Sequence, residues 1–195
     1  MSGNKKLMVK NVLGAALALS FVAAPAAFAA DAAKNMYVGI GVGQSEIRDD
    51  FGCGGITGCS SDNKDTAWRM YGGMQILDLL AVEMGYRDLG EGKLDYTGGS
   101  DKVKGKGVDM TAIGTLSVTD TITVMGRGGL MRWAVDTDSD SATGISPLYG
   151  IGAKFSLTKE VALRADWERL KNLGDYNTTG KSDVNTWTLG AMFSF

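Results

Sequence analysis

The sequence predicts an all-β fold, an eight-stranded antiparallel up-and-down β-barrel. Apolar residues recur at every second position in eight segments, which is the period of a β-strand with one apolar face. The connections between these segments are alternately short and long, as in a barrel built from successive hairpins. The chain of 195 residues also contains 28 glycines and only 2 prolines. This composition favours a protein rich in sheet.

Residues 1–29 have the features of a cleavable secretory signal peptide. Three lysines precede the apolar run VLGAALALSFVAA, and a small-residue motif that ends at Ala29 follows it. The run is shorter than the ~20 apolar residues that a transmembrane helix needs. We therefore expect residues 30–195 to form one exported domain. Loss of three lysines and no acid would make a chain of net charge −2 more acidic, which argues against nucleic acid as a partner.

The first four predicted strands alternate apolar residues with glycine or polar residues. In residues 36–47, Val38, Ile40 and Val42 share one face, and three glycines share the other. The second strand is predicted at residues 68–76, with Trp68, Met70, Met74 and Ile76 on its apolar face. The third is predicted at residues 80–89, with Leu80, Val82, Met84 and Tyr86 on that face. The fourth is predicted at residues 108–118, with Val108, Met110, Ala112, Leu116 and Val118. Leu77 and Asp78 form a tight turn between the second and third strands.

The last four strands are predicted at residues 121–133, 148–157, 161–170 and 187–195. Short turns at Thr119-Asp120 and at residues 158–160 again join them in pairs. The apolar faces of the final three carry Tyr149, Ile151, Ala153, Phe155 and Leu157; Val161, Leu163, Ala165 and Trp167; and Trp187, Leu189, Ala191, Phe193 and Phe195. Trp133 breaks the pattern, because its parity points it to the polar face. A β-bulge or a position beyond a membrane rim would each explain it.

Cys53 and Cys59 lie in the long connection after the first strand, in FGCGGITGCSSD. Five residues separate them, and three of these are glycines that let the chain turn back. In an exported protein we expect these cysteines to form a disulfide. A metal site would need further ligands, and the chain contains no histidine.

The alternation alone does not say which face points inward. A soluble lipocalin-like barrel has an apolar interior, and a membrane barrel has the reverse. The polar parity carries five cations and four anions between glycines: Arg69, Glu83, Arg87, Asp109, Arg127, Lys154, Arg164, Asp166 and Glu168. Such a nearly balanced set can pair within a small lumen that side chains fill. We therefore predict a lumen charge network that includes Glu83, Arg87, Arg127, Lys154, Arg164, Asp166 and Glu168.

The aromatic residues support the same orientation. Those near the long-loop ends of the strands are Trp68, Tyr86, Tyr149, Trp167 and Trp187, and those near the short-turn ends are Phe155, Phe193 and Phe195. Two aromatic girdles separated by aliphatic residues match the two interfaces of a membrane. The sequence thus predicts an eight-stranded antiparallel up-and-down transmembrane β-barrel in the outer membrane of a Gram-negative bacterium.

Two stretches resemble the OmpA-type transmembrane barrel family. GGMQILDLLAVEMGYRDLG is similar to the second and third strands of that family, and GISPLYGIGAKFSLTKEVALRADWERLKNLGD is similar to its sixth and seventh strands and fourth loop. The resemblance covers about residues 36–195. It implies an eight-stranded barrel whose terminal Phe195 is read by the outer-membrane assembly machinery. The peptidoglycan-binding domain of larger members is not expected, because the chain stops at the barrel.

The resemblance also implies a lumen gate, in which a glutamate changes its partner from an arginine to a lysine. Glu83 and Arg164 match the first pair. Ile113 stands where the family has the lysine, and Lys154 stands where it has a second acid. We therefore predict a plugged lumen with structural ion pairs. A small nonspecific pore is the alternative.

No enzymatic site is predicted, and no cofactor. Most mechanisms of outer-membrane enzymes use a histidine base, and the chain has none. Asp166 and Glu168 share a face, but Arg164 beside them favours a salt-bridge network over acid/base chemistry.

Lys102, Lys104 and Lys106 lie on the lipid-facing parity at the outer end of the fourth predicted strand. They form either a solvated rim or a contact with lipopolysaccharide phosphates. The predicted function is a non-enzymatic barrel in outer-membrane lipid that supports envelope integrity, with surface loops available for adhesion or recognition of an extracellular ligand. Besides the pore, a soluble lipocalin-like periplasmic binder is the second alternative.

Overall fold

The computed structural model describes residues 35–48, 60–96, 99–137, 141–174 and 181–195. Nine strands lie in these ranges: β1 Met36–Ile47, β2 Ser60–Asp62, β3 Lys64–Leu77, β4 Leu80–Tyr96, β5 Gly99–Ser117, β6 Ile122–Thr137, β7 Ser141–Ser156, β8 Val161–Leu173 and β9 Ser182–Ser194. In this part of the chain, no helix is both long and apolar enough to cross a membrane.

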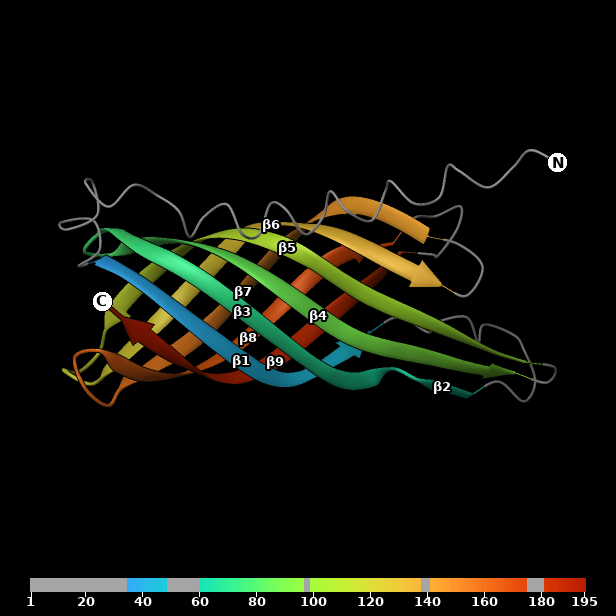
Figure 1. Ribbon diagram of the computed structural model, residues 1–195, viewed down its shortest axis with the longest axis horizontal. Coiled ribbons are helices and arrows are strands. Elements are labelled where there is room, and N and C mark those ends of the chain that lie inside the picture. Colours follow the sequence, from blue (N-terminus) through green and yellow to red (C-terminus); the bar gives the residue numbers. More distant parts are fainter. Residues whose placement is uncertain (1–34, 49–59, 97–98, 138–140, 175–180) are drawn as a thin grey trace, which may run out of the picture. The chain divides into compact units, whose positions relative to one another are not determined.

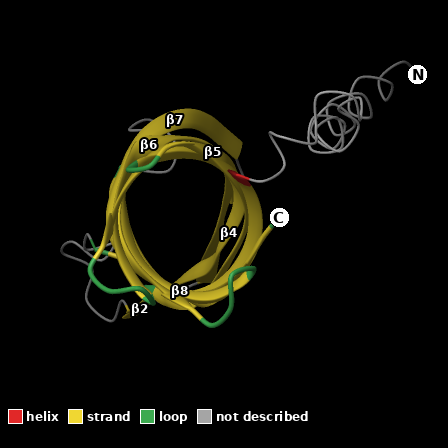
Figure 2. Cartoon of the chain, turned by 90° about the vertical axis from the view of Figure 1, so that its left-hand side faces the viewer, coloured by secondary structure: helices red, strands yellow, loops and turns green. Residues whose placement is uncertain are grey.

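Eight of the strands close into an antiparallel barrel (Figure 1). From β3 to β9 each strand pairs with the next, β9 pairs with β1, and β1 pairs with β3. The end-on view in Figure 2 shows the resulting closed ring. The three residues of β2 pair only with β4, above the rim. The predicted fold class is therefore confirmed.

The β4–β5 hairpin is longer than the sequence pattern predicts. Most of residues 90–107, which lie between the third and fourth predicted strands, continue the ladder to the pair Tyr96 and Gly99, and these ends project at the right of Figure 1. A bulge follows Asp88, where Gly90 has a φ of 77° that favours glycine. Beyond this bulge the buried positions Gly92, Gly105 and Gly107 carry no apolar side chain. The apolar alternation stops there, and so the strand signal was lost.

The outward face of the barrel is apolar and the inward face is polar. Large apolar side chains are exposed on every barrel strand, and they include Ile40, Met70, Met84, Met110, Leu130, Ile151, Leu163 and Leu189. The exposed fraction is 69% for Leu189, whereas Glu83 is fully buried in the lumen. The lipocalin-like alternative, which has the opposite arrangement, is therefore excluded.

Inward-facing glycines make room for large side chains on the neighbouring strand. Tyr37 lies opposite Gly73, and Gly39 lies opposite Tyr71, on β1 and β3. A Cβ atom would fall 2.3 Å from Cζ of Tyr71 if placed at Gly39, and 2.4 Å from Cζ of Tyr37 if placed at Gly73. Each strand thus places a tyrosine ring over a glycine of the other strand, which fills the narrow lumen without a clash.

Candidate functional site

The centre of the lumen holds eight buried charged side chains, four cations and four anions. They are Arg69 on β3, Glu83 and Arg87 on β4, Asp109 on β5, Arg127 on β6, and Arg164, Asp166 and Glu168 on β8. The exposed fraction of each residue is 7% or less. We call this set the lumen network. It contains six of the seven predicted residues, together with Arg69 and Asp109, which the sequence placed on the same face.

Glu83 is the most heavily shared member of the lumen network. Its Oε2 lies 3.1 Å from Nη1 of Arg69 and 2.9 Å from Nη2 of Arg127. Its Oε1 accepts hydrogen bonds from Nη1 of Arg164 and from the hydroxyl of Tyr37, the latter at 3.1 Å. Oε2 also accepts a hydrogen bond of 3.3 Å from Nη2 of Arg164. Oε1 therefore accepts from two donors and Oε2 from three, which compensates the buried charge.

Asp109 and Glu168 complete the opposite side of the same network. The carboxylate of Asp109 lies 2.7 Å from Nη2 of Arg69 and 2.9 Å from Nε of Arg87. The carboxylate of Glu168 lies 3.0 Å from Nη1 of Arg87 and 2.6 Å from Nη1 of Arg127. Since Arg69 and Arg127 both also reach Glu83, six residues form a closed ring of alternating charge: Glu83, Arg69, Asp109, Arg87, Glu168 and Arg127.

Arg164 and Asp166 form a branch on this ring. Nε of Arg164 lies 2.8 Å from Oδ2 of Asp166, while its Nη1 bonds Glu83. The guanidinium carbons of Arg164 and Arg69 lie 4.6 Å and 4.9 Å from the centroid of the Tyr71 ring. Arg164 is thus held by two carboxylates and one aromatic ring.

Apolar layers lie on both sides of the lumen network. The turn-side layer consists of Tyr37, Tyr71, Ala81, Ile113, Met125, Ala162 and Met192. The loop-side layer consists of Leu89, Met131, Trp133, Val135, Leu148, Leu170 and Val184. Sequence reasoning missed these layers, because apolar residues on the inward parity interrupt the alternation on which it relied.

Trp133 belongs to the loop-side layer. The ladder runs without a register shift through Gly107, Trp133 and Gly144, so β6 has no bulge here. Its Nε1 donates a hydrogen bond of 2.8 Å to Oγ of Ser146. The side chain of Trp133 therefore points into the lumen, as its parity predicts, and the explanation by a β-bulge is wrong.

Lys154 is not part of the lumen network. It is on the inward parity of β7 and half-buried, opposite Thr123 and Arg164. Neither neighbour is an acid, and among the described residues Lys154 makes no ion pair. Its position at the turn-side end of the lumen, beyond the carboxylates, explains the difference from the predicted network.

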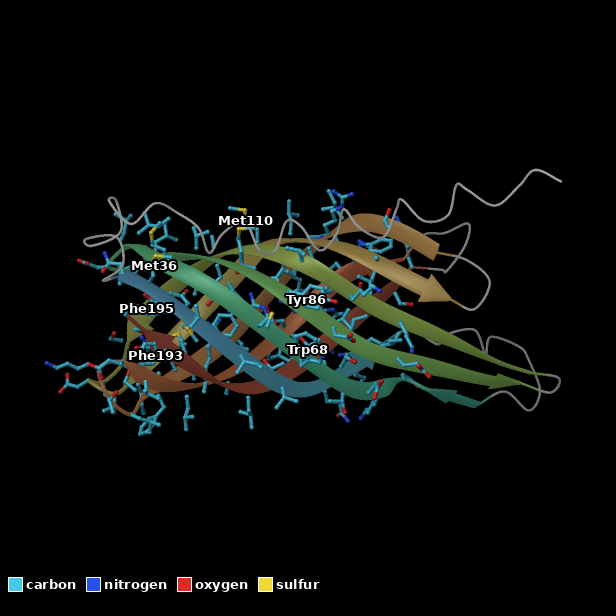
Figure 3. All side chains as sticks on the ribbon, viewed as in Figure 1. Met36, Trp68, Tyr86, Met110, Phe193 and Phe195 are labelled. Atoms are coloured by element: carbon cyan, nitrogen blue, oxygen red, sulfur yellow. The ribbon has the colours of Figure 1, made fainter. Side chains whose placement is uncertain are left out.

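The predicted aromatic girdles lie on the outward face as two groups. At the loop side, the ring centroids of Trp68 and Tyr86 are 5.5 Å apart, and Trp167 contacts Tyr149 and Trp187 at 6.5 and 6.2 Å. At the turn side, Phe193 and Phe195 are 5.4 Å apart, and Phe155 is exposed as well. Figure 3 shows that Trp68 and Tyr86 are displaced from Phe193 and Phe195 along the barrel axis.

The remaining predicted sites are only partly described. Lys104 and Lys106 are exposed on the outward face of β5, and Nζ of Lys104 lies 3.2 Å from Oε2 of Glu91. The backbone of Lys102 belongs to the same strand. Cys53, Cys59 and residues 1–29 lie outside the described residues. Within the described ranges, no three carboxylate or thiol side chains gather as a metal site would require.

Comparisons with known proteins agree with this architecture. The family model of the OmpA-like transmembrane domain matches residues 31–195. Outer membrane protein A of Escherichia coli O157:H7 is 31% identical over 201 residues, and the match covers 96% of this chain and 55% of that protein. For outer membrane protein A of Salmonella typhi the identity is 32%, over 96% of this chain and 56% of that protein. This chain spans about half the length of these relatives.

Solved structures show the same fold at lower identity. Neisserial surface protein A superposes with a TM-score of 0.58 and 19% identity, over 82% of this chain and 97% of that chain. Ail, the attachment invasion locus protein of Yersinia pestis, superposes with a TM-score of 0.54 and 17% identity, over 83% of this chain and 99% of that chain. From the closed barrel, the girdles and the family match, we conclude that this outer-membrane protein belongs to the family of OmpA-like transmembrane domains.

Proposed function

We propose that the protein is a closed, non-enzymatic barrel that stabilises the outer membrane, with a lumen that does not conduct ions. The observation that carries this proposal is the closed ring of alternating charge, in which Glu83 is held by three arginines at once. An ion that crossed the lumen would have to separate these buried pairs. Breaking a buried pair by removing one partner costs about 3–5 kcal/mol.

A change of partners would not open the lumen more easily. The lysine that resemblance to the family predicts as a second partner for Glu83 is replaced by Ile113, which is only 1% exposed within the turn-side layer. A Glu83 that left its arginines would therefore meet an apolar side chain at this position in place of a cation. The apolar layers above and below also exclude the water that a migrating ion needs.

Conductance of the refolded protein tests the closed lumen. The chain is refolded into detergent, its folding is verified by the shift between boiled and unboiled samples on a gel, and the same material is recorded in planar bilayers. We expect a heat-modifiable band and a silent bilayer. Steady, discrete conductance would contradict the closed lumen and support the small pore.

The role in envelope integrity is tested in cells. A strain that lacks the protein should become more sensitive to vancomycin and to detergent, because an intact outer membrane excludes both. Expression of the chain should restore resistance. Unchanged sensitivity of the deletion strain would contradict this part of the proposal, whatever the bilayer recordings give.

We also propose that the outer rim is available for adhesion or recognition. The β4–β5 ladder continues from the girdle residue Tyr86 to Tyr96, so its tip stands beyond the loop-side girdle. A variant in which residues 92–104 are replaced by a short turn should keep its heat-modifiable barrel but lose adherence to host cells or extracellular matrix. Equal adherence of both proteins would remove the β4–β5 hairpin from this role. Recognition of β9 by the assembly machinery stays a prediction.

A further inference from the structure

Arg132 is a charged side chain on the lipid-facing surface of β6. Its cross-strand partners are Val108 on β5 and Ile145 on β7, and Leu130 follows on the same face. All three neighbours are exposed, with exposed fractions of 48%, 68% and 56%. In the described part of the chain, no carboxylate pairs with the exposed Arg132. A guanidinium set among lipid-facing apolar side chains calls for an anion from the surroundings.

The position of Arg132 along the barrel indicates where that anion lies. Tyr86, Val108 and Arg132 form one cross-strand row over β4, β5 and β6. Tyr86 contacts Trp68 in the loop-side girdle, and aromatic girdles mark the level of the lipid headgroups. Arg132 therefore lies close to the headgroups of the outer leaflet.

Two lysines extend the positive surface outward from Arg132. Lys106 opposes Ala134, which makes it the diagonal neighbour of Arg132 at ~7 Å. Lys104 follows on the same outward face, where it pairs with Glu91. Two further acids stand in the ladder beside the lysines: Asp88 on β4 is opposite Lys106, and Asp136 on β6 is opposite Lys104. The carboxylate of Asp88 accepts a hydrogen bond of 2.8 Å from the backbone N–H of Gly90. Of the three cations, Arg132 is therefore the one whose cross-strand partners on both sides are apolar.

We propose that Arg132, with Lys106 and Lys104, binds a phosphate group of lipid A, the glycolipid anchor of lipopolysaccharide in the outer leaflet. A guanidinium can donate two parallel hydrogen bonds to a phosphate, and the ammonium groups add point charges. The inference rests on the proposed function, since it requires a barrel seated in the outer membrane. It adds Arg132, which the sequence pattern did not single out, to the predicted lysine contact.

Lipid retention tests this site. The full chain and its variants are refolded into phosphatidylcholine vesicles that contain bisphosphorylated lipid A, extracted in mild detergent, and analysed by native mass spectrometry for bound lipid A. Arg132→Gln should lower the retained lipid A about tenfold, and the double variant Lys104→Gln/Lys106→Gln should lower it several-fold. Arg132→Lys should give an intermediate value, because it keeps the charge but loses the fork.

Lys64→Gln is the matched control. Lys64 is another exposed cation near the outer end of its strand, but its Nζ lies 3.7 Å from Oε1 of Glu46. We expect this variant to retain lipid A like the unchanged protein. If Arg132→Gln also retains it fully, the proposed site is wrong. Equal retention of phosphatidylglycerol would likewise overturn the assignment to lipid A.

The outcome is separable from that of the proposed function. Every variant is first checked for the heat-modifiable band that reports folding. If Arg132→Gln does not fold, the lysine double variant tests the same site. A silent bilayer without selective lipid retention would overturn the lipid site and leave the closed lumen intact. Steady conductance together with selective retention of lipid A would overturn the closed lumen and support the lipid site.

Discussion

Arg87 and Glu168 join opposite walls of the barrel through two parallel hydrogen bonds. Nη1 and Nη2 of Arg87 donate to the two oxygens of Glu168 at 3.0 and 3.1 Å. Their strands, β4 and β8, stand four places apart in a ring of eight, so the pair spans the full width of the lumen. Such a two-pronged geometry orients both side chains.

Replacing Arg87 with methionine should destabilise the barrel strongly. The change leaves Glu168 with only Arg127 and Asp109 with only Arg69, so two buried carboxylates lose a partner. We expect a loss of about 3–5 kcal/mol in the free energy of unfolding, measured by urea titration in lipid vesicles. The double variant Arg87→Met/Glu168→Met should recover part of the loss. A loss below about 0.5 kcal/mol in the single variant would show that the pair contributes little to the free energy of unfolding.

Glycine at position 39 should not tolerate even a methyl group. Gly39→Ala places a Cβ against the ring of Tyr71, and we expect a cost of about 1–3 kcal/mol from overpacking. Gly126→Ala is the control, because Gly126 faces outward and no atom lies within 4 Å of its added Cβ. Equal urea midpoints for both variants would contradict the close packing of Tyr71 on Gly39.

A lysine at position 113 should give Glu83 an alternative to its arginine partners, at the position where the family has a lysine. Ile113→Lys puts an ammonium group in the turn-side layer, one strand from Glu83, opposite Ala81 and Arg127. We expect intermittent conductance in planar bilayers, because Glu83 could then leave Arg164. Ile113→Met, which keeps the layer apolar, should remain silent. A silent lysine variant with a normal heat-modifiable band would mean that partner exchange does not open this lumen.

Asp183 predicts a loss of stability in acid. It lies on β9 beyond Trp187, at the loop-side rim, where its carboxylate accepts hydrogen bonds from Nζ of Lys171 at 2.8 Å and Nη2 of Arg169 at 2.7 Å. Burial raises the pKa of Asp183, but these hydrogen bonds and charges outweigh it and lower the pKa to about 2. The ordinary value in an unfolded chain is about 3.9.

The stabilisation from Asp183 is therefore complete above about pH 4 and disappears as the pH falls toward 2. Urea midpoints measured between pH 2 and pH 6 should fall more steeply for the unchanged protein than for Asp183→Asn, which has no charge to lose. Parallel curves would show that the rim carboxylate does not contribute to stability.

Trp133→Phe should cost about 1 kcal/mol. The change removes the hydrogen bond from Nε1 to Oγ of Ser146 but keeps an aromatic ring in the loop-side layer. Ser146 would still donate to the backbone oxygen of Asn172 at 3.0 Å, which limits the loss. Comparison with Ser146→Ala and with the double variant in a double-mutant cycle isolates the hydrogen bond, and a coupling energy near zero would contradict it.

The sequence predicts the strands of this barrel and their two faces better than the contacts between side chains inside the lumen. Alternation placed Glu83 and Arg164 on the polar face, because side chains of a strand change face at each residue, and the balanced charges of that face indicated that it points inward. It could not say that Glu83 bonds three arginines, since partners across the lumen depend on the relative register and tilt of strands distant in sequence. Lys154 shows the same limit, because parity does not tell how deep in the lumen a residue lies.

Apolar residues inside the lumen were a second source of error. Met131, Trp133 and Leu170 pack in the loop-side layer, yet a period of two assigns one polarity to each face. The prediction missed the charged hairpin between Leu89 and Val108 for a different reason. Its buried positions Gly92, Gly105 and Gly107 are glycines, so no apolar alternation marks it as a strand.

The pairs between β4 and β8 also constrain how the protein is assembled. Glu83 and Arg164, like Arg87 and Glu168, are separated by 81 residues, and contacts of such long sequence separation form late and slowly. An open sheet inserted in lipid would carry these charges without partners, at a high cost. Insertion and closure should therefore proceed as one concerted step, and a half-zipped intermediate should accumulate only where water or a chaperone solvates the unpaired arginines and carboxylates.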